Sequence, residues 1–152
     1  MRPDPVVPQA RTTAQAAVVL DTNIVLDVFV FNDVAAQPLK QALEAGQLDW
    51  LATAPMRDEL ERVLGYPQIS SRLALCQLEA HEVLAEFDQH ARIAEAPAQA
   101  GPTCHDPDDQ KFIDLAVAHQ ATLLSKDQAV LCMKKRLAAH DVRAQSAIEL
   151  VA

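Results

Sequence analysis

Glycine is scarce in this chain, which has three glycines among its 152 residues. The dinucleotide-binding pattern GxGxxG and the phosphate-binding pattern GxxxxGK[ST] both require closely spaced glycines. Neither pattern can be written anywhere in the sequence. The sequence therefore excludes the two commonest glycine-rich nucleotide sites.

Cysteines and aromatic residues are also few. Cys76, Cys104 and Cys132 are odd in number and far apart, and no CxxC pair suggests a zinc or redox centre. We therefore expect buried, reduced thiols. Aromatic residues make up 4% of the chain, so the core must consist mainly of Leu, Val, Ile and Ala. Such a core, in a chain long enough for about one domain, suits helices packed on a parallel sheet.

Basic residues are outnumbered, because 13 Lys and Arg stand against 21 Asp and Glu and give a formal charge of -8. This balance argues against binding to nucleic acid or to an anionic membrane by bulk charge, since that affinity comes from Lys and Arg replacing counterions at phosphates. A site that uses metal ions escapes this argument.

Long apolar runs are missing as well. No stretch approaches the ~18 apolar residues of a membrane span. The N-terminal segment lacks the continuous apolar core of a secretory signal. We expect a cytoplasmic protein with no membrane partner, in which residues 1 to 15 form a flexible tail and residues 16 to 152 form one domain.

Short apolar runs alternate with segments of helical periodicity along the rest of the chain. Strands are expected at 16–21, 48–53, 91–96, 121–127 and 142–144, and helices at 34–46, 55–64, 107–119 and 127–139, with a helix or helix pair between 70 and 89. This alternation predicts an α/β fold, a three-layer α/β/α sandwich around a mostly parallel sheet.

Two acids directly end apolar runs that are typical of buried strands. Asp21 ends the run VVLD, and Asp127 ends the run LLSKD. Ligands of parallel α/β sheets bind outside the carboxyl ends of the strands. We therefore expect Asp21 and Asp127 to lie at the same edge of the sheet.

A third acid lies on the buried face of the helix predicted at 107–119. At about 100° per residue, the apolar stripe of this helix is centred close to Asp109. Asp114 then falls on the far side, facing water, and Asp108 falls on the margin of the stripe. Asp106 is placed to cap the helix. The helix thus directs one carboxylate inward.

The helix that begins at Pro55 carries three acids in the stretch PMRDELERVL, and only Glu59 borders its apolar face. Four ionised carboxylates that converge on one place repel one another unless protons or cations intervene, and Mg²⁺ or Mn²⁺ with oxygen ligands is the usual remedy. The sequence therefore predicts a divalent metal site formed by Asp21, Glu59, Asp109 and Asp127.

Four stretches resemble the acidic landmarks of PIN-domain ribonucleases, in their usual order. They are LDTN at 20–23, RDEL at 57–60, DPDDQKFIDLA at 106–116 and LLSKD at 123–127. The resemblance covers about residues 17 to 150 and is closest to the toxin components of toxin–antitoxin pairs. It implies that the catalytic, metal-binding acids are Asp21, Glu59, Asp109 and Asp127.

Neighbouring polar residues also match or depart from the family pattern. Asn23 and Ser125 occupy positions that usually support the acids by hydrogen bonding, so the resemblance implies that they assist cofactor binding. They could equally bond to nearby backbone. Lys126 stands where relatives often carry a small residue, and either contacts a phosphate or is solvated. The basic run 134–136 is typical of a solvated helix face.

The resemblance implies a metal-dependent endoribonuclease that hydrolyses phosphodiester bonds of RNA. In such an enzyme the metal ion lowers the pKa of bound water and neutralises the charge that develops on the phosphate. The resemblance also implies RNA as the substrate and an antitoxin protein as a partner, and it is compatible with a homodimer.

Two other classes of acidic α/β protein need residues that this sequence does not supply. Phosphatases with an Asp nucleophile need a second Asp two residues after Asp21, where this chain has Asn23. A receiver domain needs an acid pair at its first strand and a phosphoacceptor Asp at the end of a middle strand, and the sequence shows neither. The alternative that stays open is a non-catalytic PIN-like module that binds RNA or protein.

Overall fold

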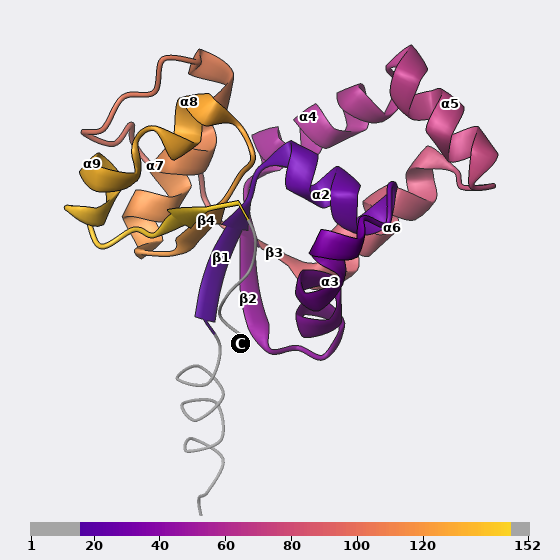
Figure 1. Cartoon of the computed structure of the whole chain (residues 1–152), viewed down its shortest axis with the longest axis horizontal. Helices are drawn as coiled ribbons and strands as arrows, with labels where there is room; N and C mark the ends of the chain where they lie inside the picture. The colour runs from indigo at the N-terminus through magenta and orange to yellow at the C-terminus, as the bar shows by residue number, and fades with distance from the viewer. Residues whose placement is uncertain (1–15, 147–152) are drawn as a thin grey trace, which may run out of the picture.

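A computed structural model describes residues 16–146 of the chain, so the segment expected to form an N-terminal tail lies outside the described residues. Five parallel strands form one sheet in the order β3-β2-β1-β4-β5 (Figure 1). The strands of the described part are β1 (Ala16–Leu20), β2 (Leu48–Ala52), β3 (Ala91–Ile93), β4 (Thr122–Leu124) and β5 (Ala144–Gln145).

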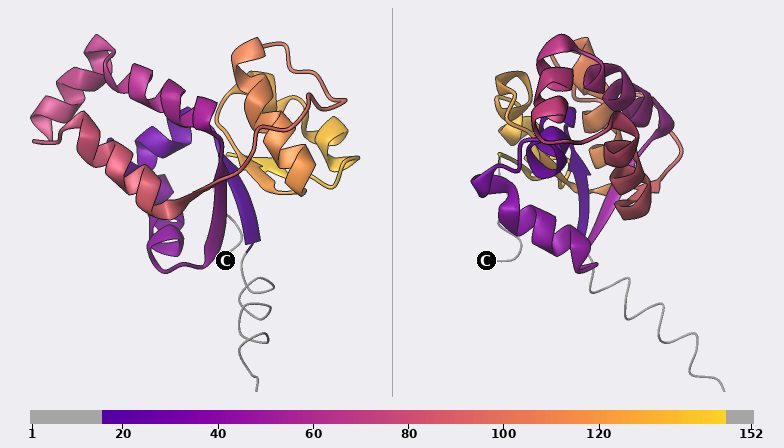
Figure 2. Two further views of the ribbon diagram at one scale, coloured as in Figure 1. Left: turned by 180° about the vertical axis from the view of Figure 1, so that it is seen from behind. Right: turned by 90° about the vertical axis from the view of Figure 1, so that its right-hand side faces the viewer.

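Helices lie on both sides of this sheet (Figure 2), so the predicted α/β/α architecture is confirmed. Two 3-10 turns, η1 (Val34–Ala36) and η2 (Pro107–Asp109), precede α3 and α7. No helix in residues 16–146 is both long enough and apolar enough to span a bilayer. The α-helices of these residues are α2 (Thr22–Phe29), α3 (Gln37–Glu44), α4 (Ala54–Leu64), α5 (Pro67–Leu75), α6 (Ala80–His90), α7 (Gln110–His119), α8 (Gln128–Leu131) and α9 (Lys134–Ala138).

The centre of the sheet is buried on both faces. Strand β1 pairs with β2 and with β4, and its residues Val18 and Val19 have no exposed surface. Parallel strands that are covered by helices carry apolar side chains on both faces, which explains the unbroken run of Val and Leu. Trp50 of β2 packs against Phe87 and Phe29, with ring centroids 5.1 and 6.1 Å apart. Aliphatic side chains fill most of the remaining core.

Helix α2 is not predicted by the sequence pattern. Six of its eight residues are buried, including the polar Thr22 and Asp27. A helix that is covered on nearly all sides lacks the polar stripe that marks an amphipathic helix. Strand β1 therefore leads directly into a helix, and Asp21 is the N-cap residue between them.

Two helical segments are each divided in two. The segment 70–89 contains a helix pair, α5 and α6, and the left-handed residue Gln77 lies between them with φ 57°. The single helix expected at 127–139 is wrong, because α8 and α9 are separate. The break lies at Met133, whose N–H bonds to the carbonyl of Val130 in a tight turn and whose side chain is buried.

Three predicted strands also differ clearly in extent. Strand β3 ends at Ile93 rather than at residue 96, and the last strand occupies 144–145 rather than 142–144. The interior strand β4 occupies 122–124 rather than 121–127, because the chain turns after Leu124 into the start of α8, which Asp127 caps. The first two of these strands, β3 and β5, lie at the edges of the sheet. An edge strand has a neighbour on one side only, so its regular pairing can end sooner than its sequence suggests.

The three cysteines are free thiols, but only one of them is buried. Cys104 is buried as expected, whereas Cys76 and Cys132 are exposed, so the expectation is wrong for these two. Each of the exposed thiols follows the last residue of a helix, α5 or α8. Periodicity predicts such end positions poorly, because the helix no longer fixes the direction of the side chain.

The acidic stretch DPDDQKFIDLA forms η2 and α7. Asp106 is the N-cap of η2, and its carboxylate accepts a hydrogen bond from the N–H of Asp108 at 3.0 Å. Pro107 occupies the first position of the turn, where its missing N–H costs nothing. Asp106 thus performs the capping that the sequence predicts, and the Asp109 side chain does not serve as a cap.

Replacing Asp106 with Ala should remove this cap and lower the free energy of unfolding by about 0.5 to 2 kcal/mol. Asp106→Asn is the matched control, because asparagine keeps an accepting oxygen at the cap and should lose much less. Urea unfolding in the presence of a chelator measures both variants. Equal losses would mean that the charge of Asp106, and not its hydrogen bond, stabilises the helix start.

Candidate functional site

Three acids meet at the carboxyl ends of the two central strands β1 and β4, which lie side by side (Figure 1). Asp21 directly follows β1, Asp127 stands just beyond β4, and Asp109 closes the turn before α7. One carboxylate oxygen from each of these acids lies within 4.8 Å of the other two. Side chains far apart in the sequence therefore form one acidic cluster, named here the three-acid cluster.

Ser125 joins two members of the cluster. Its hydroxyl donates a hydrogen bond to the carboxylate of Asp21 at 2.7 Å and accepts one from the N–H of Asp127 at 3.0 Å. Ser125 has no exposed surface. The N–H of Asp21 also donates to the carbonyl of Leu124 at 3.0 Å. The pairing of β1 with β4 thus determines how Asp21 and Asp127 lie relative to each other.

Asp21 is held in a buried, negatively charged environment. Burial raises the pKa of its carboxyl above the ordinary value, and hydrogen bonds from Ser125 and from the backbone of Asn23 lower it. The charges of Asp127 and Glu59 raise the pKa further. Asn23 acts on Asp21 through its backbone N–H, and the residue itself is exposed.

Asp109 is the most strongly perturbed acid of the cluster. Its exposed fraction is 6%, and its Oδ2 atom is buried without a hydrogen-bond partner among the described residues. Burial raises the pKa of Asp109 to about 8, with further contributions from its hydrogen bond to Asp127 and from the charge of Asp21. An orphaned buried carboxylate oxygen is costly unless a proton or a cation satisfies it.

Glu59 lies beside the three-acid cluster rather than within it. Its Oε2 atom accepts a hydrogen bond from the hydroxyl of Thr22 at 2.6 Å, and its Oε1 atom forms an ion pair with the ammonium group of Lys111. Its side chain is 16% exposed. Both carboxylate oxygens of Glu59 therefore already have partners from the chain.

Lys111 and Thr22 are site residues that sequence reasoning missed. On the helical wheel Lys111 lies opposite the apolar stripe of α7, which predicts a solvated side chain. Its long aliphatic stem instead brings the ammonium group back to Glu59 and to the carbonyl of Asp108, at 2.6 Å from the latter. One sequence signal could have found Lys111. The predicted set of four acids contained no cation, and four carboxylates that lie close together favour a nearby basic residue.

The other acids of the acidic stretch lie outside the cluster. Asp108 is exposed. The expectation that Asp114 faces water is wrong, because its Oδ1 atom accepts hydrogen bonds from the N–H of Ala100 and from the side chain of Gln110, both at 2.8 Å. The helical wheel shows only the direction of Asp114, and a loop from elsewhere in the chain packs over that side.

Basic residues near the site also differ in their partners. Lys126 forms an ion pair with Asp27, which is a buried residue of α2. It is therefore neither fully solvated nor directed at the three-acid cluster. Residues 134–136 are exposed, as expected, and Arg136 donates a hydrogen bond to the carbonyl of Thr103 at 3.0 Å.

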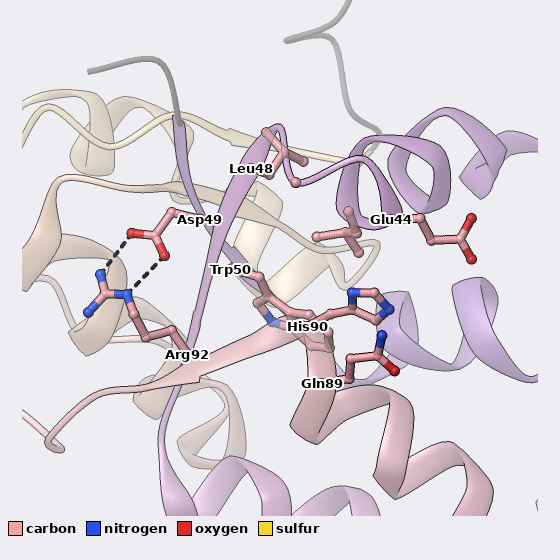
Figure 3. A pocket seen from close by; sticks show the side chains of 9 residues that line it. Glu44, Leu48, Asp49, Trp50, Gln89, His90 and Arg92 are labelled. Atoms are coloured by element: carbon pink, nitrogen blue, oxygen red, sulfur yellow. Dashed lines mark hydrogen bonds and ion pairs between the residues drawn. The ribbon is translucent and has the colours of Figure 1, made fainter. Parts of the chain in front are cut away.

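A separate cavity lies at the opposite, amino end of β2 (Figure 3). Its volume is about 570 Å³, and its lining comes from the ends of α3 and α6 and from strands β2 and β3. Arg92 is already paired there with Asp49 through two hydrogen bonds of 2.7 and 3.0 Å. His90 stacks on Phe29, with ring centroids 6.2 Å apart. This cavity shares no residue with the three-acid cluster.

Comparison with known proteins agrees with this geometry. The family model described as PIN domain matches residues 17–129, a range that contains β1 except for its first residue, β2 to β4, and all three acids of the cluster. A search of curated proteins gave no match. The match to the family model covers most of the chain and includes the elements that position the acids. The chain therefore belongs to the PIN domain family.

Proposed function

We propose that this protein is an endoribonuclease that depends on a divalent metal ion, Mg²⁺ or Mn²⁺, and hydrolyses phosphodiester bonds of RNA. The fold is that of a nuclease-type family. The observation that carries the proposal is the convergence of Asp21, Asp109 and Asp127, whose carboxylate oxygens lie within 4.8 Å of one another.

The donor set fits a hard divalent cation. Mg²⁺ and Mn²⁺ prefer carboxylate oxygens and bind them at about 2.0 to 2.2 Å, so one ion can contact several acids of such a cluster. The buried Oδ2 atom of Asp109 has no partner among the described residues, which leaves it available as a ligand. Structural acids are normally satisfied by hydrogen bonds or ion pairs, so this orphaned oxygen favours a functional interpretation.

The residues of the site have distinct parts in this proposal. Asp21, Asp109 and Asp127 would hold the ion, and Ser125 would orient Asp21 by its hydrogen bond. When bound, the ion supplies an activated water at neutral pH and neutralises charge on the phosphate. No side-chain nucleophile is then required.

The biological setting is also proposed, as the toxin of a toxin–antitoxin pair acting in the cytoplasm. The series of acidic stretches from LDTN to LLSKD supports it, because this series resembles the toxin components most closely. An antitoxin protein and a second copy of the chain are the partners that this setting suggests.

Incubation of the pure protein with single-stranded and structured RNAs, in Mn²⁺, Mg²⁺ or chelator, tests the proposal. We expect cleavage with an ion and none with chelator. The same ions should raise Tm, since a ligand at 100 times its Kd stabilises the folded state by about 2.7 kcal/mol. RNA binding without cleavage would support the non-catalytic module instead, and an unchanged Tm would contradict the metal site.

A further inference from the structure

We propose that Lys111 is a phosphate-binding residue of this site, and that Glu59 is the positioning residue that holds Lys111 rather than a ligand of the metal ion. The inference rests on the proposed ribonuclease function and deepens it, because it names the group that receives the RNA backbone. It also separates Glu59 from the other three acids.

The first argument comes from the partners of the carboxylates. Both oxygens of Glu59 are occupied, one by the hydroxyl of Thr22 at 2.6 Å and one by the ammonium group of Lys111. Asp109, in contrast, has a buried oxygen without a partner in the described part of the chain. To bind an ion directly, Glu59 would have to share or give up at least one of these charge-assisted contacts, whereas Asp109 would give up none at Oδ2.

The second argument comes from the way Lys111 is held. Its ammonium group contacts the carboxylate of Glu59 and the carbonyl of Asp108, and lies 5.0 Å from the ring centre of Phe112. Its side chain is 27% exposed, so it is accessible from solvent although it is fixed in place. A lysine that is held in one position loses less conformational entropy when it binds a ligand than a free surface lysine does.

The third argument is electrostatic. A phosphate that approaches three carboxylates is repelled, and the chain as a whole carries a charge of -8. Within residues 16–146, Lys111 is the cation that pairs with one of the four predicted acids, whereas Lys126 pairs with Asp27. A lysine binds phosphate as a compact point charge with three N–H donors, and Glu59 and the carbonyl of Asp108 take two of those of Lys111. The third donor can therefore bind a phosphate oxygen while Lys111 keeps its position.

The test compares four variants by two measurements. Glu59→Gln, Lys111→Met and Lys111→Arg are made beside Asp109→Asn, which serves as the reference for loss of a metal ligand. The exposed residues Glu61 on α4 and Lys134 on α9 supply matched controls, as Glu61→Gln and Lys134→Met. The measurements are the rise in Tm with Mn²⁺ and the kcat and KM for Mn²⁺-dependent cleavage of a single-stranded oligoribonucleotide.

We expect Glu59→Gln and Lys111→Met to keep the rise in Tm with Mn²⁺ that Asp109→Asn loses. Both should raise KM about tenfold or more, because each removes a charge-assisted contact or the residue that positions it. Their effect on kcat should be smaller. Lys111→Arg should restore most of the affinity because it keeps the charge, and the two control variants should resemble the wild type.

The opposite results are equally informative. If Glu59→Gln loses the Mn²⁺ response as Asp109→Asn does, Glu59 is a metal ligand and the inference is wrong. A wild-type KM in Lys111→Met would overturn the phosphate contact. If the wild type cleaves no RNA, the proposed function fails, and the affinity for the same labelled oligoribonucleotide in Mn²⁺ decides instead. A loss of about tenfold in Lys111→Met then supports the contact, and an unchanged affinity overturns it.

Discussion

An Asp109→Asn variant is expected to lose metal-dependent RNA cleavage by roughly 100-fold or more, because even residues that only support a metal ligand commonly cost 10- to 100-fold when replaced. The fold should survive, since asparagine has nearly the same shape. Without metal and at neutral pH or above, the variant should be more stable than the wild type, because ionised Asp109 is buried beside Asp21 and Asp127. Cleavage rates and urea unfolding in chelator measure the two effects.

Asp108→Asn is the matched control for this variant. Asp108 lies one residue earlier in the same turn, carries the same charge and is exposed. Its backbone, and not its carboxylate, contacts Asp106 and Lys111. Cleavage by Asp108→Asn should therefore stay near that of the wild type. Full activity in Asp109→Asn would place the catalytic ion elsewhere and would require a different set of ligands.

The stability of the metal-free protein is expected to fall as pH rises from about 4 to about 8. The pKa of Asp109 is raised to about 8 from an ordinary value of 3.8, so the folded state binds this proton more tightly than the unfolded state does. Its stabilising contribution is complete below the unfolded pKa and is lost as pH rises through the folded pKa. The loss from this group is at most about 1.4 kcal/mol per pH unit.

The Asp109→Asn variant has no carboxyl proton at this position. Its stability should therefore lack the pH dependence that comes from Asp109. The wild type and the variant should therefore be similar in stability near pH 4, and the wild type should be the less stable of the two at pH 9. Urea unfolding in chelator across this range gives the comparison. A constant difference between the two proteins would show that Asp109 titrates normally.

The affinity for metal should depend on the same proton in the opposite direction. A divalent ion must displace the proton of Asp109, so its apparent affinity should rise up to about tenfold per pH unit and level off above about pH 8. Titration of Mn²⁺ into the wild type at several pH values, followed by Tm or calorimetry, measures this slope. An affinity that is independent of pH below 8 would contradict the assignment of Asp109 as a ligand.

The positions of Asp21, Asp109 and Asp127 could be predicted because each follows from a local pattern. Two acids end apolar strands, and one occupies the centre of an apolar helix face. Parallel strands then bring their carboxyl ends to one edge, whatever the length of the connections. Local periodicity and one topological rule were therefore sufficient for the three-acid cluster.

The partners of Glu59 could not be predicted in the same way. They come from α2, which is buried on almost all sides and lacks a periodic signal, and from a lysine that lies on the polar side of α7. The contacts of Asp114 and Lys126 are similarly long-range, because they depend on how a loop and a neighbouring helix pack. Sequence periodicity gives the direction of a side chain and does not give its partner.

The contact between Ser125 and Asp21 has a consequence for the protein during translation. The two residues are 104 positions apart in sequence, and they meet only when β4 pairs with β1. Domains emerge from the ribosome N-terminal end first, so β1, β2 and β3 can become available before β4 exists. A nascent chain that has reached only β3 contains Asp21 and Glu59 but neither Asp109 nor Asp127. If the protein cleaves RNA as proposed, the message being translated is not exposed to a complete site until nearly all of this fold has been synthesised.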